Sequence, residues 1–249
     1  MAGHSHWAGI KHKKAANDAK RGKSWSKIAR MIIVAARNGG GDPSANLTLR
    51  YAIDKAKAAN MPKDTIEKAV KKGTGDLEGA NYEEVLYEGY GPSGVAVMVE
   101  ALTDNRNRTG PEIKRVFEKH GGSLGATGCV NWMFSKKGLI TVGTSTVDED
   151  DLMELALGAG AEDMEHTGEV FEITCEPAAY EELKKVLEAK EIAMEVAEIS
   201  MVPQTMAEIG DEAVAKRVVS LMEAFDDHDD VQNAYANFDI SDEVMAKLA

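Results

Sequence analysis

The chain has few cysteines, few aromatic residues and no long apolar run, and each shortage excludes a class of protein. Cys129 and Cys175 are the only cysteines among 249 residues, so we expect neither a disulfide framework nor a cysteine-based zinc site. The most apolar stretch, residues 28–36, contains Arg30 and is too short to span a bilayer. No apolar run follows the first residues as in a signal peptide, so we expect a cytoplasmic protein that binds no membrane.

What the chain does have is an uneven distribution of charge. Residues 1–72, here called the basic arm, contain 16 lysines and arginines and 5 acidic residues, whereas the other 177 residues contain 13 basic and 37 acidic residues. The formal charge of −13 for the whole chain therefore averages over two opposite regions. Such a dense basic block indicates a polyanion-binding surface, because like charges this close repel unless a partner neutralises them.

The basic arm is predicted to form a small bundle of helices. A short polar helix should end at Gly22, and a second should begin after Ser24. A third is expected over residues 44–59, and a fourth should open at Pro62 and close at Gly73. We expect phosphate contacts from the cations that lie off the apolar stripes, namely Lys11, Lys13, Lys14, Lys20, Arg21, Lys23, Lys27 and Arg30.

The other 177 residues, 73–249, are here called the acidic body, and its first part is predicted to be an α/β unit. Strands are expected at residues 85–90 and 95–102, joined by a Gly-Pro-Ser-Gly turn. A helix should follow, with Thr109 and Glu112 forming a capping box, and a third strand is expected at residues 130–134.

A second unit should begin after a boundary at residues 135–138. Its expected order is strand, helix, strand, strand, helix and strand, which is the ferredoxin-like order. The chain should then return to the first unit. The expected elements of the second unit are strand 139–142, helix 148–157, a hairpin around Gly168 that leads into strand 170–175, helix 178–189 and strand 194–201. After the return to the first unit, helix 212–225 and strand 231–235 are expected.

Arg106 and Arg108 form the first candidate site outside the basic arm. They lie between a strand end and a helix start, where backbone N–H groups favour an anion, so they either contact phosphate or pair with acidic residues of the body. The glycine-rich residues 121–128 lack the ending of a phosphate-binding P-loop, and we expect a turn that needs positive φ angles.

Two acidic clusters, residues 148–151 and 226–230, are the other candidates. Neither has the alternating ligands and central glycine of a calcium loop, so we expect solvated helix ends rather than a metal site. No serine–histidine pairing or spaced pair of carboxylates forms a catalytic constellation. We therefore expect no catalytic residue, cofactor, bound metal or small-molecule substrate, and a protein that is not an enzyme.

Several long strings in the sequence are specific enough to compare with known families. They are Met1–Trp7, Lys13–Lys23, Gly39–Pro43, Tyr87–Pro92, Thr103–Thr109, Gly121–Gly125, Asp229–Gln232 and Asn237. Together they resemble the YebC/PmpR family of probable transcriptional regulatory proteins, to which the mitochondrial translational activator of cytochrome c oxidase subunit I is related. His6 stands where a lysine is common in the family, which removes one fixed charge.

The resemblance implies an N-terminal helical domain and two α/β domains, one inserted into the other. With the residue patterns it predicts an α+β fold in which an N-terminal helical bundle precedes two α/β domains, the second ferredoxin-like and inserted into the first. The expected domains are residues 1–78, residues 79–134 with 204–249, and residues 135–203. The resemblance also implies nucleic-acid-linked regulation in the cytoplasm, and it supplies no catalytic residues.

The expected function is a nucleic-acid-binding regulator, and the resemblance makes a DNA-binding transcriptional regulator the primary prediction. One alternative is a ribosome-associated translation factor that places the basic arm against ribosomal RNA. Another is an adaptor whose ferredoxin-like unit binds a protein. Charge does not separate DNA from RNA, and aromatic residues are only 6% of the chain, with Trp7 and Trp25 the tryptophans near the basic arm, so stacking on single-stranded RNA has little support.

Overall fold

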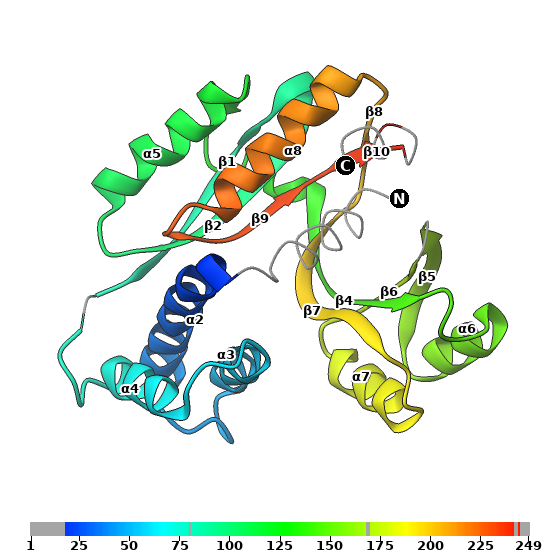
Figure 1. The fold of residues 1–249 in the computed structure, drawn as a ribbon, viewed down its shortest axis with the longest axis horizontal. Coiled ribbons are helices and arrows are strands. Elements are labelled where there is room, and N and C mark those ends of the chain that lie inside the picture. Colours follow the sequence, from blue (N-terminus) through cyan, green and yellow to red (C-terminus); the bar gives the residue numbers. More distant parts are fainter. Residues whose placement is uncertain (1–17, 80, 168–169, 242–243, 245–249) are drawn as a thin grey trace.

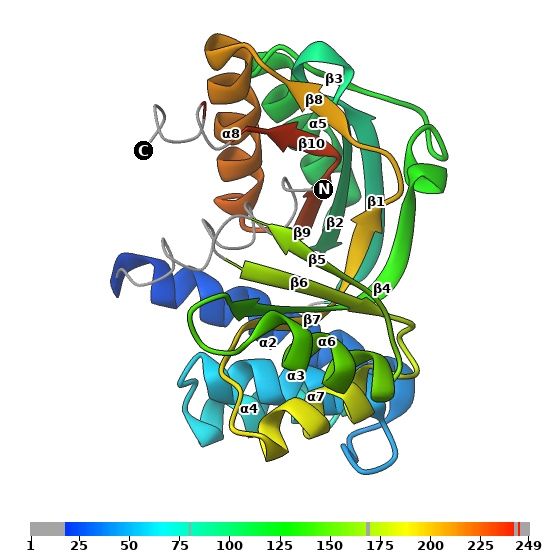
Figure 2. The same cartoon turned by 90° about the vertical axis from the view of Figure 1, so that its right-hand side faces the viewer.

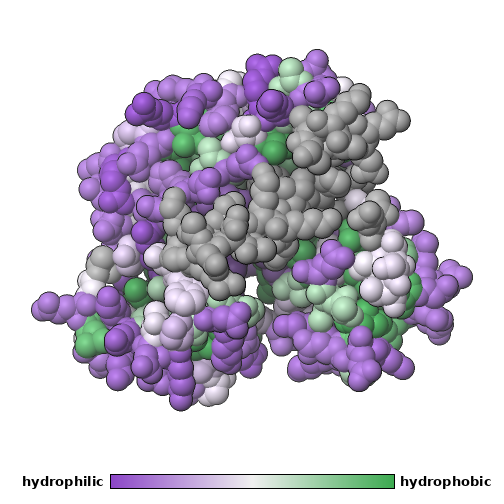
Figure 3. Space-filling view, in the orientation of Figure 1, coloured by the Kyte–Doolittle hydropathy of each residue, from purple (hydrophilic) through white to green (hydrophobic). Residues whose placement is uncertain are grey.

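The computed structural model describes residues 18–79, 81–167, 170–241 and 244, with side chains from Ser24 onward. These residues form an N-terminal bundle of helices and two α/β units, the second ferredoxin-like and inserted into the first (Figure 1). The α+β fold class predicted from the sequence is therefore confirmed. None of the helices in these ranges combines the length and apolar character that crossing a membrane requires, and Figure 3 shows hydrophilic residues over much of the described surface.

The helical bundle contains α2 (Asp18–Gly39), α3 (Leu47–Ala58) and α4 (Lys63–Thr74). Helix α2 is continuous, so the predictions that Gly22 ends a helix and that Ser24 caps the next one were wrong. A glycine inside a helix costs about 1 kcal/mol relative to alanine, which is less than starting a new helix requires. The bundle encloses its own apolar core, which includes Ile32, Leu49 and Ala56.

Helix α4 also runs further than predicted. It follows Pro62 as expected, but it continues through Gly73 to Thr74 and ends at Gly75, whose φ of 87° is left-handed. Gly73 is buried, and a Cβ atom there would lie 2.5 Å from the carbonyl oxygen of Ile33. This glycine therefore does not close the helix; it allows α4 to approach the backbone of α2.

The middle unit contains a four-stranded sheet in the order β3–β1–β2–β9. Helices α5 and α8 supply much of its core together with the strands, and both helices lie over the same sheet in Figure 1. Two further short strands, β8 and β10, pair in parallel beside it. The bounds are β1 (Glu83–Tyr90), β2 (Ala96–Thr103), α5 (Arg106–Lys119), β3 (Ser123–Leu124), β8 (Ala207–Ile209), α8 (Glu212–Asp226), β9 (Val231–Ala236) and β10 (Phe238–Ile240).

Two details of this unit differ from the prediction. Helix α5 begins after Asn105, whose side chain accepts the N–H of Arg108, so Thr109 lies inside the helix and does not cap it. Residues 130–134 do not form a separate strand, because Asn131–Met133 is a 3₁₀ turn and the next strand starts at Phe134.

The inserted unit has the strand order β5–β6–β4–β7, which is the antiparallel order of a ferredoxin-like sheet. Figure 2 shows α6 and α7 on one face of this sheet. Strand β4 begins at Phe134, so residues 135–138 belong to a strand and not to a connection; the domain limits given above otherwise stay predictions. The bounds are β4 (Phe134–Gly143), α6 (Glu149–Gly158), β5 (Ala161–Thr167), β6 (Val170–Cys175), α7 (Tyr180–Ala189) and β7 (Met194–Pro203).

Candidate nucleic-acid interface

The eight cations of the basic arm that are predicted to contact phosphate belong to α2 or to the residues before it. Lys11, Lys13 and Lys14 lie outside the described residues, and Lys20, Arg21 and Lys23 lie in the first two turns of α2, where only the backbone is described. Lys27 and Arg30 follow on the same helix, and their side chains are described. Because α2 is one helix, positions 20, 23, 27 and 30 fall on one face of it.

Lys27 and Arg30 contact the acidic loop, residues 226–230, which joins α8 to β9. The Lys27 ammonium donates to the carbonyl oxygen of Asp226 at 2.6 Å. The Arg30 guanidinium donates to the carbonyl oxygen of Asp229 at 2.5 Å and to the carboxylate of Asp230 at 3.0 Å. It also lies over the ring of Tyr82, 5.4 Å from the centroid. These contacts, two to backbone carbonyl oxygens and one to a carboxylate, fasten α2 to the middle unit; phosphate binding by Lys27 and Arg30 stays a prediction.

Asp230 is the centre of this contact and is only 3% exposed. Its second carboxylate oxygen accepts hydrogen bonds from Arg108 at 2.6 Å and from the Thr109 hydroxyl at 2.7 Å. Burial alone would raise the pKa of Asp230, but these two hydrogen bonds and the positive charges of Arg108 and Arg30 hold it below its usual value. The expectation that residues 226–230 form a solvated helix end was therefore wrong for Asp230, because the chain enters the buried strand β9 at the next residue.

Arg106 and Arg108 both face carboxylates in this structure. Arg106 lies 3.7 Å from Glu83, and Arg108 reaches Asp104 at 3.2 Å in addition to Asp230. The hydrogen bond and charge of Asp230 raise the pKa of Arg108 above its usual value. Of the two interpretations given above, the geometry supplies the internal pairing; phosphate binding by these arginines stays a prediction.

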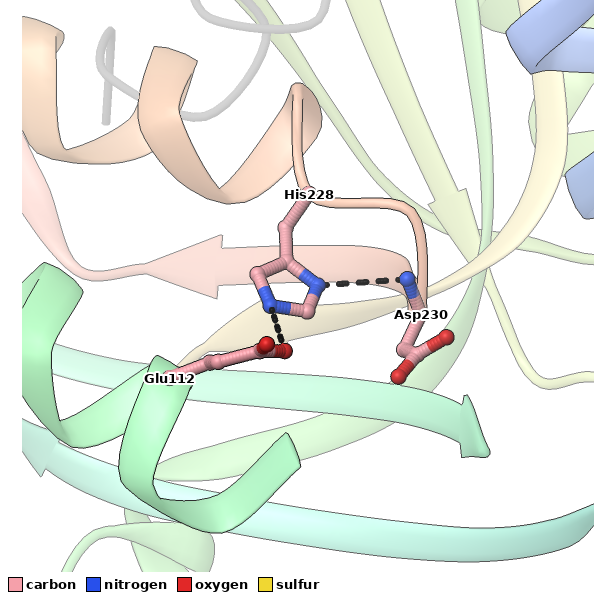
Figure 4. Close-up of side chains that lie close together, drawn as sticks. All are labelled: Glu112, His228 and Asp230. Carbon is pink, nitrogen blue, oxygen red and sulfur yellow. Dashed lines mark hydrogen bonds and ion pairs between the residues drawn. The ribbon is translucent and has the colours of Figure 1, made fainter. Parts of the chain in front are cut away.

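Glu112, His228 and Asp230 lie close together beside the same loop (Figure 4), and their ligand atoms fall within 4.8 Å of one another. His228 accepts the backbone N–H of Asp230 at Nδ1, and its Nε2 lies 3.2 Å from Glu112. The Asp230 oxygens already accept from Arg30, Arg108 and Thr109. A cation would have to displace these partners, so we assign no metal to this cluster. The other acidic cluster, residues 148–151, is exposed at the start of α6 as expected, with Asp148 as its cap.

The end of the glycine-rich loop at residues 121–128 and the residues that follow it bind a carboxylate of the chain itself. Gly121 and Gly128 have φ angles of 80° and 87°, which confirms the expected turn. Glu88 is 2% exposed and accepts the backbone N–H groups of Gly128, Val130 and Asn131 at 2.6, 2.9 and 2.7 Å. Burial would raise the pKa of Glu88, but the three donors together lower it.

Sequence reasoning missed Glu88 and Asp230 because their partners are far away in the chain. Arg30 and Asp230 are separated by 200 positions, and Glu88 and Asn131 by 43. One local signal for Asp230 existed, since it directly precedes a strand of buried residues, where a solvated carboxylate is out of place.

These observations define a class of protein: a basic helical bundle fastened by arginine–aspartate contacts to an acidic α/β body with an inserted ferredoxin-like unit. A model described as the TACO1/YebC protein N-terminal domain matches residues 5–76, and a model described as the TACO1/YebC second and third domain matches residues 82–238. The chain therefore belongs to the TACO1/YebC family, which confirms the resemblance seen in the sequence.

Relatives and a solved structure agree with this assignment over the full length. The chain is 54% identical to a probable transcriptional regulatory protein of Syntrophobacter fumaroxidans, with 100% of both chains covered. It is 56% identical to one of Desulforapulum autotrophicum, with 98% of both covered. A crystal structure of a conserved hypothetical protein from Aquifex aeolicus superposes with a TM-score of 0.85 at 51% identity, covering 96% of this chain and 99% of that one.

Proposed function

We propose that this protein regulates gene expression by binding nucleic acid through its basic arm, and that its target is DNA in the cytoplasm. The observation that carries the proposal is the separation of charge, with 16 of the 29 basic residues in the first 72 positions of an otherwise acidic chain. The names of the relatives, probable transcriptional regulatory proteins, support a role as a regulator. We propose no reaction, because the buried carboxylates of Glu88 and Asp230 are both occupied by structural hydrogen bonds.

The contacts of α2 support different roles for its cations. Lys27 and Arg30 face oxygen atoms of the acidic loop. The cations before Ser24 precede this contact in the chain, and we propose that they supply most of the phosphate contacts. Lysines act as point charges and read little base sequence, so the affinity should be largely electrostatic.

The test is the salt dependence of binding. The triple substitution Lys13→Ala, Lys14→Ala and Lys20→Ala should weaken binding to duplex DNA and reduce the slope of log K against log salt by about 0.9 for each phosphate that is no longer neutralised. A matched control replaces Lys184, Lys185 and Lys190, which lie in or directly after α7 on the acidic body, and should leave the slope unchanged. Equal affinity and slope for the arm variant and the wild type would refute the proposal and favour the protein-binding adaptor.

DNA and ribosomal RNA are then separated in living cells. Ultraviolet cross-linking followed by sequencing of the attached nucleic acid should recover mostly promoter DNA. Recovery of mostly ribosomal RNA would replace DNA-binding regulation with the translation-factor alternative, while leaving the basic arm as the binding surface.

A further inference from the structure

Trp132 is an unusual surface residue outside the basic arm, because its side chain is 69% exposed. It lies in the 3₁₀ turn Asn131–Met133, between the middle unit and the start of β4. Its neighbours Val130 and Phe134 are 0% and 6% exposed. The backbone is thus anchored on both sides of an indole that points outward. Single exposed apolar side chains are common on protein surfaces, but this ring is the most exposed of the large apolar side chains in the described part of the chain, and ordered backbone holds it on both sides.

The turn that carries Trp132 is held in place by hydrogen bonds to the Glu88 carboxylate. The three backbone N–H groups that this carboxylate accepts come from Gly128, Val130 and Asn131, so the residues directly before the tryptophan are held in place. The backbone N–H of Gln204 also donates to the carbonyl oxygen of Met133 at 2.8 Å. A partner would therefore meet a preorganised side chain and lose little conformational entropy on binding.

The polar edges of the exposed rings are already satisfied. The indole N–H of Trp132 donates to the carbonyl oxygen of Cys129 at 3.2 Å, and the hydroxyl of Tyr90, 38% exposed, lies 3.1 Å from the same oxygen. What Trp132 offers a partner is thus the face of its ring rather than a hydrogen bond. This is the property used by stacking platforms, which accept any base because every base has a π-face.

The surroundings favour a base over a protein. The residues before Trp132 are exposed but small or polar, namely Ala126, Thr127, Gly128 and Asn131. Protein interfaces instead centre on a wider apolar patch. We propose that Trp132, with Tyr90 beside it, is a stacking site for an unpaired base of single-stranded nucleic acid. This inference rests on the proposed function, and it adds a second contact point on a different domain from the basic arm.

The test compares single strands with duplexes. Trp132→Ala should lower the affinity for a single-stranded oligonucleotide of about 12 nucleotides by roughly 5- to 150-fold, since stacking is worth about 1–3 kcal/mol per base. Duplex binding should not change, and the slope against log salt should stay as in the wild type, because stacking releases no counterions. Fluorescence anisotropy of labelled oligonucleotides at several salt concentrations measures both quantities.

Three further variants make the result specific to a ring. Trp132→Phe should retain most of the affinity, whereas Trp132→Leu, which is apolar without a π-face, should lose as much as the alanine variant. Leu157→Ala removes another large exposed apolar side chain, 51% exposed on the inserted unit, and should change nothing. Unchanged thermal melting of each Trp132 variant confirms that the fold is intact.

The triple substitution Lys13→Ala, Lys14→Ala and Lys20→Ala, here called the arm variant, separates failure of this inference from failure of the proposed function. If it loses binding to both forms while Trp132→Ala binds single strands like the wild type, the stacking site is refuted and the proposed function stands. If neither variant loses affinity for either form, both proposals fall. Loss of a co-purifying protein by Trp132→Ala, with unchanged nucleic-acid binding, would overturn the stacking site in favour of a protein contact.

Discussion

Replacement of Asp230 with asparagine is the sharpest test of how the helical bundle is fastened to the body. The substitution keeps the size of the side chain but removes the negative charge shared by Arg30 and Arg108. Removing one partner of a buried ion pair costs about 3–5 kcal/mol, because the other charge is left uncompensated. Since the Arg108 side chain is 44% exposed and water can replace part of the missing interaction, we expect a smaller cost, about 2–3 kcal/mol of unfolding free energy.

The effect should depend on pH with a definite sign. The pKa of Asp230 is lower in the folded protein than in the unfolded chain, so the ionised carboxylate stabilises the fold. That stabilisation is fully present above the unfolded pKa of about 3.9 and is lost as the pH falls through the folded value. The difference between wild type and Asp230→Asn should therefore be largest near neutral pH and shrink on acidification below about pH 4.

Urea unfolding at neutral and acidic pH measures both quantities. The control is Glu208→Gln, which removes one charge from an exposed position on β8 and should leave the unfolding free energy within about 0.5 kcal/mol of the wild type. Hydrogen exchange of the α2 amides around Arg30 should increase in Asp230→Asn, because the contact with the body is weakened. An Asp230→Asn protein as stable as the wild type at pH 7, with unchanged exchange in α2, would refute the reasoning.

Two further predictions concern buried contacts elsewhere. Glu88→Ala should lower the unfolding free energy by about 3 kcal/mol, because the backbone N–H of Gly128 and its two neighbours lose a charged acceptor, and Glu88→Gln should cost less since it restores one oxygen; urea unfolding measures both, and a neutral Glu88→Ala would contradict the assignment. Gly73→Ala should lower the melting temperature despite alanine's better helix propensity, at a cost of about 1–3 kcal/mol, because its Cβ would meet the Ile33 carbonyl at 2.5 Å. Gly158→Ala in α6, with open space around the new Cβ, is the matched control and should be neutral or stabilising; equal effects of the two substitutions would exclude the packing explanation.

The sequence predicted those features that depend on local periodicity. The ferredoxin-like order of elements follows from apolar alternation and turn residues within short windows, and α6, α7 and α8 begin within two residues of their expected starts. Helix α3 starts three residues later than expected because Asn46 caps it, and the same amide donates to the carbonyl oxygen of Ala35 in α2.

Several errors arose because tertiary contacts overrode local signals. Gly73 is a helix breaker by propensity, yet it lies inside α4, where α2 packs against it, whereas Gly22 lies inside α2 because one glycine costs less than starting a new helix. Thr109 resembles a cap in the sequence, but its hydroxyl instead supports the buried Asp230. Trp132 has no neighbours in the sequence that mark it as exposed, so only the folded chain reveals it.

The pairing of β4 with β7 determines how the inserted unit is attached to the rest of the molecule. Phe134 and Pro203 are paired across these strands, so the inserted unit enters and leaves at adjacent positions and is suspended on a two-stranded stem. The rings of Tyr51 on α3 and Tyr180 on α7 meet edge to face at 6.3 Å, which gives the inserted unit a second support on the helical bundle. The inserted unit is therefore held to the rest of the molecule both by the chain at the β4–β7 stem and by this ring contact.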